Sequence, residues 1–330
     1  MKVITFGEVM LRLSPPGVER FVQTDTLAMH FGGTEANVAV SLAQLGLETA
    51  HVTRFPDHAL GRSATGYLRQ YGVGTQHVRY GAGRLGLYFL ETGAGSRASQ
   101  IIYDRVDSAF SRITPTDVDW ESILTGADWF HWTGITPALS QGAADCLLAG
   151  IQTANRLGVP VSADIVYRSN LWQYGRTPQE IMPALTEGCT LVLGNKSLFS
   201  ELYGVVGSTF IESGMAMMRR FPTIRYITDT KRNSLSASHN QLSAKLFDGD
   251  MVHKSRVYDV QPIVDRIGTG DAYMAGLIYG LLTFKNPQRA VEFGAAASAL
   301  KHTIAGDVNL ATVTEIETLE AGDSSGKLRR

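Results

Sequence analysis

Apolar and polar positions along the chain follow two alternating rhythms. Short runs rich in β-branched and aromatic residues predict strands at residues 2–6, 49–55, 129–132, 159–166, 190–195 and 224–229. Between them, residues 35–46, 61–72 and 142–158 place apolar side chains at helical spacing, and the first of these segments ends at Gly46. This strand–helix alternation predicts an α/β fold in which helices cover both faces of a mostly parallel sheet.

Two segments interrupt the alternation, at about residues 10–33 and 84–110. Both are β-like, rich in turn residues and without a helical pattern. We expect them to form a small antiparallel sheet that projects from a single domain of residues 1–330, as a lid or as a dimer-forming flap. Residues 81–86 (GAGRLG) match the spacing of a dinucleotide-binding turn, but a strand-like run follows them instead of a helix. We therefore assign this segment to a hairpin turn.

Composition narrows the classes of function. The chain has 330 residues, is 44% hydrophobic and carries a formal net charge of −1, so it can bury a large core and has no charge excess for nucleic acid or an anionic membrane. Its two cysteines, Cys146 and Cys189, lie in apolar surroundings, which indicates a reducing compartment rather than a disulfide framework. We expect neither a membrane span nor a signal peptide, because apolar runs are short and Glu8 interrupts the first. The prediction is a cytoplasmic protein.

The most informative chemistry lies in Gly268-Thr269-Gly270-Asp271, directly before a nearly all-apolar helical run. A helix N-terminus exposes unpaired N–H groups and carries partial positive charge, and glycines let an anion approach the backbone closely. A carboxylate beside such an anion hole is suited to accept a proton from a hydroxyl that attacks phosphorus. The alternative is a glycine-rich turn whose aspartate only caps the helix.

The surrounding motifs favour the catalytic interpretation. This stretch resembles the D-x-x-G-x-G-D motif of the ribokinase-like (PfkB) carbohydrate kinases, with Asp265 and Asp271 at its ends. The family's G-G-x-x-x-N-x-A segment is matched from Gly32 to Ala39, and its D-x-x-G step by Asp57 and Gly61. The resemblance implies a doubly wound sheet with a small β-sheet lid, and a sugar kinase that uses ATP and Mg²⁺; it also allows a monovalent cation. It further implies that Asp271 is the base, that Gly268, Thr269 and Gly270 neutralise the transferred charge, and that Gly33 and Asn37 contact the sugar.

Further segments are similar to those of 2-keto-3-deoxygluconate kinases, whose matching tyrosines and arginines hold an acyclic sugar acid. The positions that match are Tyr88, Tyr103, Arg105 and Arg168. Two arginines directed at one cleft imply an anionic substrate group, because an unpaired buried guanidinium is costly and a carboxylate accepts two bonds from it. Each arginine could instead be a surface residue, and each tyrosine a packing residue of its strand. Ile135 is either a wall of the cleft or part of the core.

The same resemblance implies nucleotide contacts for Asn195, Thr228, Lys231 and Ser236, together with Gly268 and Gly270. Several positions depart from the family patterns: Val166 replaces an asparagine, Leu198 replaces the acid of an N-x-x-E motif, and Thr230 and Asn233 replace strand glycines. Glu201 lies one helical turn beyond Leu198. Metal ligands therefore stay unassigned.

Three functions follow from these observations. The first is ATP-dependent phosphorylation of a sugar acid, with 2-keto-3-deoxygluconate converted to its 6-phosphate. The second is a kinase for a neutral ketose such as fructose, which the arginine pair disfavours. The third is a non-catalytic sugar-binding protein on the same fold, which the intact Asp271 disfavours. By resemblance we also expect a homo-oligomer formed through the lid.

Overall fold

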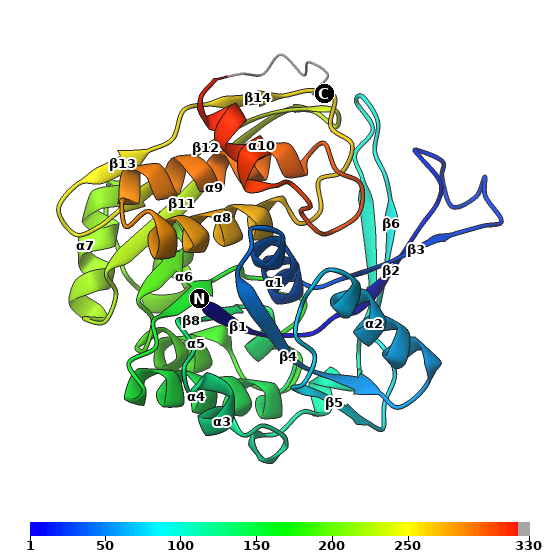
Figure 1. The fold of residues 1–330 in the computed structure, drawn as a ribbon, viewed down its shortest axis with the longest axis horizontal. Coiled ribbons are helices and arrows are strands. Elements are labelled where there is room, and N and C mark those ends of the chain that lie inside the picture. The colour runs from blue at the N-terminus through cyan, green and yellow to red at the C-terminus, as the bar shows by residue number, and fades with distance from the viewer. Residues whose placement is uncertain (323–330) are drawn as a thin grey trace.

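The computed structural model describes residues 1–322 and contains two β-sheets, of which the larger carries helices on both faces (Figure 1). The larger sheet runs in the order β13-β12-β11-β10-β9-β8-β1-β4-β5, with β14 paired to β12. Its strands are β1 (Lys2–Phe6), β4 (Glu48–Pro56), β5 (Val78–Gly81), β8 (Trp129–Thr133), β9 (Val161–Asp164), β10 (Leu191–Leu193), β11 (Tyr226–Ser236), β12 (His239–Phe247), β13 (Val252–Lys254) and β14 (Tyr258–Val260).

The strands from β5 to β11 are parallel, and β12 to β14 add an antiparallel edge. Central strands are apolar on both sides; all residues of β8 are buried. This continuous burial is expected where helices cover both faces of a sheet. The predicted α/β fold with a mostly parallel sheet is therefore confirmed.

Two layers of helices form the core with this sheet. Apolar side chains of α1 (Thr34–Gln44), α8 (Thr269–Thr283), α9 (Pro287–Lys301) and α10 (Val313–Glu320) pack in one cluster. Those of α3 (Trp120–Leu124), α4 (Gln141–Arg156), α5 (Pro178–Thr186), α6 (Lys196–Tyr203) and α7 (Phe210–Arg220) pack in another. Helix α2 (Ala59–Gln70) packs against α1 at the base of the smaller sheet. Three short 3₁₀ turns, η1 (Phe110–Arg112), η2 (Pro115–Asp117) and η3 (Thr136–Ala138), lie in the connections.

Helix α8, which begins at the predicted motif, is buried almost all around. Its residues from Asp271 to Gly280 are all buried. It approaches α9 so closely that a Cβ on Gly276 would lie 2.8 Å from Cα of Gly294. Small residues at this contact let α8 and α9 pack closely in the interior of the molecule.

The smaller sheet has the order β3-β2-β6-β7, with β2 (Met10–Ser14), β3 (Ala28–Gly32), β6 (Leu87–Glu91) and β7 (Gln100–Asp104). It projects to one side of the larger sheet (Figure 1). The predicted antiparallel pairing holds for β2 with β3 and for β6 with β7, but the central pair, β2 and β6, is parallel. Strands β2 and β6 both run away from the larger sheet, and the strand after each, β3 or β7, returns antiparallel to it. The central neighbours β2 and β6 therefore run in the same direction.

The prediction of a hairpin turn at residues 81–86 is wrong. Gly81 ends β5 in the larger sheet, and the chain then crosses to β6 in the smaller one. Within residues 1–322, no helix is both long and apolar enough to cross a membrane.

Candidate active site

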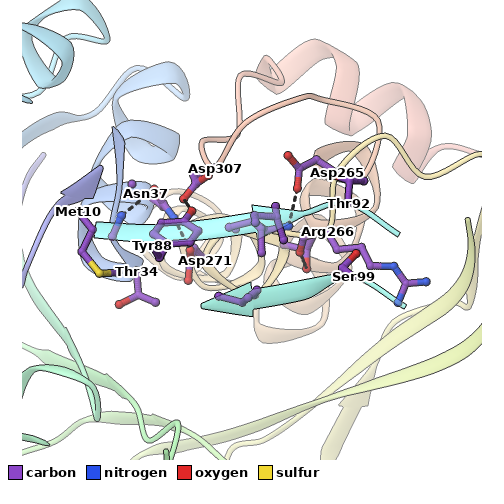
Figure 2. Close-up of a pocket in the computed structure, with 18 of the residues that line it drawn as sticks. Met10, Thr34, Asn37, Tyr88, Thr92, Ser99, Asp265, Arg266, Asp271 and Asp307 are labelled. Atoms are coloured by element: carbon purple, nitrogen blue, oxygen red, sulfur yellow. Dashed lines mark hydrogen bonds between the residues drawn. The ribbon is translucent and has the colours of Figure 1, made fainter. Parts of the chain in front are cut away.

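A cavity of about 440 Å³ lies between the smaller sheet and the carboxyl ends of the parallel strands (Figure 2). Ligands in open α/β sheets bind at this edge, where strands end and helices begin. The start of α1, the smaller sheet, the segment after β9 and the loop before α8 all contribute to its wall. The polar side chains in the wall are Thr34, Asn37, Tyr88, Thr92, Ser99, Tyr103, Asp164, Arg168, Arg232, Asp265, Arg266, Thr269, Asp271 and Asp307.

Asp271 lies in the first turn of α8 and faces this cavity. Its Oδ2 accepts a hydrogen bond of 2.7 Å from Nδ2 of Asn37, and Figure 2 shows the pair at the centre of the site. Burial raises the pKa of Asp271 to about 8; the bond from Asn37 lowers it by a smaller amount, and repulsion from neighbouring carboxylates adds to the increase. A carboxyl group that titrates near neutral pH is suited to accept a proton during catalysis.

The backbone before Asp271 has the geometry that the predicted anion hole requires. Gly268 has φ 77°, and a Cβ there would lie 1.8 Å from the carbonyl oxygen of Asp307. Only glycine fits this position. A Cβ on Gly270 would meet no atom within 4 Å, because that residue faces open space. The first N–H groups of α8 have no acceptor within the helix and carry its positive dipole end.

A second cavity, of about 290 Å³, adjoins the first on the far side of the anion hole. It lies between the β11–β12 pair and helices α8 and α9. Thr269, Gly270 and Arg232 line both cavities. The two cavities therefore meet at the anion hole, which is where a group transferred from one ligand to another would have to pass.

A buried polar network joins the smaller sheet to the anion hole. Arg12, on β2, is 4% exposed, and its Nη1 lies 2.7 Å from Oδ2 of Asp265 and 2.9 Å from Oδ1 of Asp307. The hydroxyl of Tyr88 donates to the other oxygen of Asp307. Burial lowers the pKa of Arg12, but the two carboxylates outweigh it and raise the pKa overall. Asp265 also accepts from the N–H of Ile267, which fixes the turn into the anion hole.

Two further acids belong to this region: Glu35, which is buried, and Asp164, which is half-buried in the cavity wall. Glu35 accepts hydrogen bonds from the backbone and hydroxyl of Thr133 and from the hydroxyl of Thr136, while burial raises its pKa. Burial also raises the pKa of Asp164 to about 7. Val166, at the position where the family pattern has asparagine, lines the cavity and donates its N–H to Asp164.

The structure brings most of the predicted site residues to one place. Gly33, Asn37, Tyr88, Tyr103, Arg168, Gly268, Thr269, Gly270 and Asp271 line the first cavity, and Lys231 lines the second. Gly33, directly before α1, also lies very close to the backbone of Glu8: a Cβ on Gly33 would lie 2.0 Å from the carbonyl oxygen of Glu8.

Other predicted contacts do not line either cavity. Arg105 is buried, and its Nε donates to Oε2 of Glu8 at 2.9 Å. Ile135 precedes η3 and is only partly buried. Asn195 caps α6 by accepting from the N–H of Leu198, and Ser236 ends β11. Thr228 is fully buried and donates to the carbonyl oxygen of Lys245.

Among the charged residues, sequence reasoning missed Asp307, Arg232 and Arg266 in these walls, and Arg12 in the network that Asp265 and Asp307 form with it. Arg12 was detectable, because it interrupts the otherwise apolar strand MLRLS. Thr230 and Arg232 line the second cavity where Thr228 was expected. Alternation along β11 places all three on one side of the strand, but only the later two lie beyond the buried end of the sheet. Asp307 carried no local signal.

Known proteins are similar to this chain over nearly its whole length. The sequence model described as pfkB family carbohydrate kinase matches residues 1–312. A 2-dehydro-3-deoxygalactonokinase of Haloferax volcanii is 32% identical over 98% of each chain. A 2-dehydro-3-deoxygluconokinase of Thermoproteus tenax is 27% identical over 93% of this chain and 90% of its own. The crystal structure of a 2-dehydro-3-deoxygluconokinase from Thermotoga maritima is 41% identical, covers 98% of both chains and superposes with a TM-score of 0.92.

Proposed function

This chain belongs to the pfkB family of carbohydrate kinases, and on that premise we propose that it transfers the γ-phosphoryl group of ATP to a hydroxyl of a sugar acid. The proposed reaction converts 2-keto-3-deoxygluconate to its 6-phosphate. The observation that carries the proposal is the placement of Asp271 in the wall of the first cavity, where it is bonded to Asn37 and directly follows Thr269 and Gly270, which line both cavities.

The proposed mechanism uses few groups. The acceptor hydroxyl binds near Asp271, which takes its proton as the oxygen attacks the γ-phosphorus of ATP; the bond from this phosphorus to the bridging β-phosphate oxygen breaks, and ADP leaves. Asn37 orients the carboxylate through its 2.7 Å hydrogen bond. The N–H groups of Thr269, Gly270 and Asp271 at the start of α8 stabilise charge on the transferred oxygens, and these groups need no rearrangement as the charge develops.

Arg168 is the best candidate to bind a substrate carboxylate. It lines the cavity and is exposed, and its guanidinium has one long contact, of 3.4 Å, with the carbonyl oxygen of Tyr167. Arg105, by contrast, is paired with Glu8. Tyr103, whose ring lies 6.0 Å from that of Tyr88, gives the carbon chain a flat wall. Relatives over nearly the full length are named as kinases of dehydro-deoxy sugar acids.

ATP would occupy the second cavity, with its phosphates toward Gly270. Among residues 1–322, no group of three or more His, Cys, Asp or Glu side chains is arranged to hold a metal ion. Mg²⁺ would therefore enter with the nucleotide, held by phosphate oxygens and water, as is usual for this ion. There it would neutralise charge on the phosphates.

Assembly through the smaller sheet is part of the proposal. One row across its four strands consists of Met29, Leu13, Phe89 and Ile102. Met29 and Ile102, at its two ends, are 52% and 57% exposed. A second copy of the chain would cover this apolar row. We place the protein in the cytoplasm, where ATP is available.

The test is an ATP-consumption assay with 2-keto-3-deoxygluconate, its galactonate epimer, gluconate, fructose and ribose. We expect phosphorylation of a keto-deoxy sugar acid and little with the neutral sugars. Preference for fructose would support the neutral-ketose kinase instead, and binding of a sugar without ATP consumption would support a non-catalytic role.

A further inference from the structure

Arg232 lies where the two cavities meet. It lines both of them together with Thr269 and Gly270 of the anion hole. On β11, Thr228 points its hydroxyl at Tyr273 of α8. Side chains two and four residues further along a strand point to the same side, so Thr230 and Arg232 also face the start of α8.

No carboxylate neutralises Arg232 within residues 1–322. The acid nearest to it on β11, Asp229, is paired with Lys245, whose Nζ lies 3.0 Å from Oδ2 of Asp229. The charge of Arg232 acts on two nearby groups, Arg266 and His302. Like-charge repulsion from Arg232 adds to burial in lowering the pKa of Arg266 and, as a smaller effect, that of His302. Neither Arg232 nor Arg266 forms an ion pair within residues 1–322, so an anion that bound beside them would be stabilised by their charge.

Arg266 is held in place by the protein itself. Its Nε donates to the carbonyl oxygen of Ala237 at 3.2 Å, and its Nη2 donates to the carbonyl oxygen of Ser236 and, at 3.0 Å, to Oδ1 of Asn240. These acceptors carry no net charge, so the positive charge of Arg266 stays available to the cavity. The two arginines thus differ: Arg266 is fixed and Arg232 is free to move toward a ligand.

We propose that Arg232 is a catalytic residue that binds the transferring phosphoryl group, with Arg266 as a fixed positive charge behind it. This rests on the proposed kinase function. At positions 230 and 233 the chain lacks the glycines of the family's nucleotide strand, and Arg232 supplies a guanidinium next to them. A planar guanidinium makes two parallel bonds to phosphate oxygens, and a mobile one follows the phosphoryl group as it moves between oxygens.

Position distinguishes this role from binding of the sugar carboxylate. Arg168, beyond the end of β9, lines only the first cavity, whereas Arg232 lines both cavities, as Gly270 does. The carboxylate of a sugar acid and the hydroxyl that is phosphorylated lie at opposite ends of the carbon chain. An arginine beside the anion hole therefore meets phosphate oxygens.

The experiment compares Arg232→Gln and Arg232→Lys with the wild type. Exposed Arg219, in the last turn of α7, supplies the matched control Arg219→Gln. For each protein, kcat and both KM values are measured with ATP and the sugar that the wild type accepts. Calorimetric titration with ATP and Mg²⁺ in the absence of sugar gives the nucleotide affinity directly.

We expect Arg232→Gln to lower kcat by about 10²–10³-fold, as the loss of one charge-stabilising donor does. The KM for sugar should stay within about 2-fold, Arg232→Lys should recover part of the rate, and Arg219→Gln should match the wild type. Unchanged kcat in Arg232→Gln would overturn the proposal, and a loss confined to sugar affinity would assign Arg232 to the carboxylate. If the wild type accepted only a neutral sugar, the proposed substrate would fail, but the role of Arg232 could still be read with that sugar.

Discussion

Replacement of Asp271 by asparagine separates the role of this side chain in catalysis from the loss of stability that results from burying its ionisable carboxyl group. The amide has nearly the same shape, and its oxygen can accept the hydrogen bond from Asn37 that Oδ2 accepts now. The variant therefore keeps the packing and loses only the ability to ionise. Two opposite effects follow, on turnover and on stability.

The magnitude of the stability effect follows from the pKa. Burial raises the pKa of Asp271 from an ordinary 3.8 to about 8. Between these values the unfolded chain releases the proton while the native protein keeps it, so native stability falls as pH rises from about 4 to about 8. A pH of 7 lies roughly 3 units above the pKa of this side chain in the unfolded chain. Keeping the proton in the native protein therefore lowers the free energy of unfolding by an amount of order 4 kcal/mol.

Asparagine has no such cost. We expect Asp271→Asn to raise the melting temperature of the ligand-free protein at pH 7–8 by about 5–10 °C, and by much less near pH 5. Turnover should fall by about 10²–10⁴-fold, the usual effect of losing a general base. Thermal unfolding followed by circular dichroism at pH 5 and 8, together with an ATP-consumption assay, measures both effects.

Asp25→Asn is the matched control, because Asp25 is exposed and lines neither cavity. Equal melting temperatures for wild type and Asp271→Asn at pH 8 would refute the burial argument. Unchanged turnover would remove Asp271 from the chemistry. A variant that is both more stable and nearly inactive would support both parts of the reasoning.

Four further outcomes are expected. In the wild type, kcat/KM should rise with pH between 6 and 8, because the free enzyme must ionise Asp271, whose pKa is about 8; a flat profile would contradict this. Arg168→Lys should weaken binding of a sugar acid far more than of its neutral analogue, and equal losses in a competition assay would disprove a carboxylate contact. Arg12→Met should destabilise the protein by about 3–5 kcal/mol in denaturant unfolding, since two buried carboxylates lose their partner, whereas Arg84→Met, which breaks an exposed pair with Asp104, should change little. Gly268→Ala should abolish turnover by displacing the anion hole, since its Cβ would lie 1.8 Å from a carbonyl oxygen; a fully active variant would show that the loop yields.

Local patterns along the chain determined much of this protein. Alternation of strand-like and helical segments was sufficient for the mostly parallel sheet, because hydrophobic periodicity reflects which sides of an element are covered. The segment from Gly268 to Asp271 was recognisable for the same reason: a left-handed glycine at φ 77° and a first-turn acid are properties of consecutive residues. The family motifs also lie within short stretches.

Only the tertiary structure decided which of these residues meet. The bond between Asn37 and Asp271 joins positions 234 residues apart, and the pair of Arg12 with Asp307 spans 295. Both arginines assigned to the substrate look alike in the sequence, yet Glu8 neutralises Arg105 while Arg168 stays free of any carboxylate within 4.0 Å in residues 1–322. Likewise, Thr228 and Thr230 point to the same side of β11, but Thr228 is buried under the helices, whereas Thr230 lies beyond the covered part of the sheet and lines the second cavity. Charge pairing and burial depend on the path of the whole chain, because they are set by neighbours in space that no local window of sequence contains.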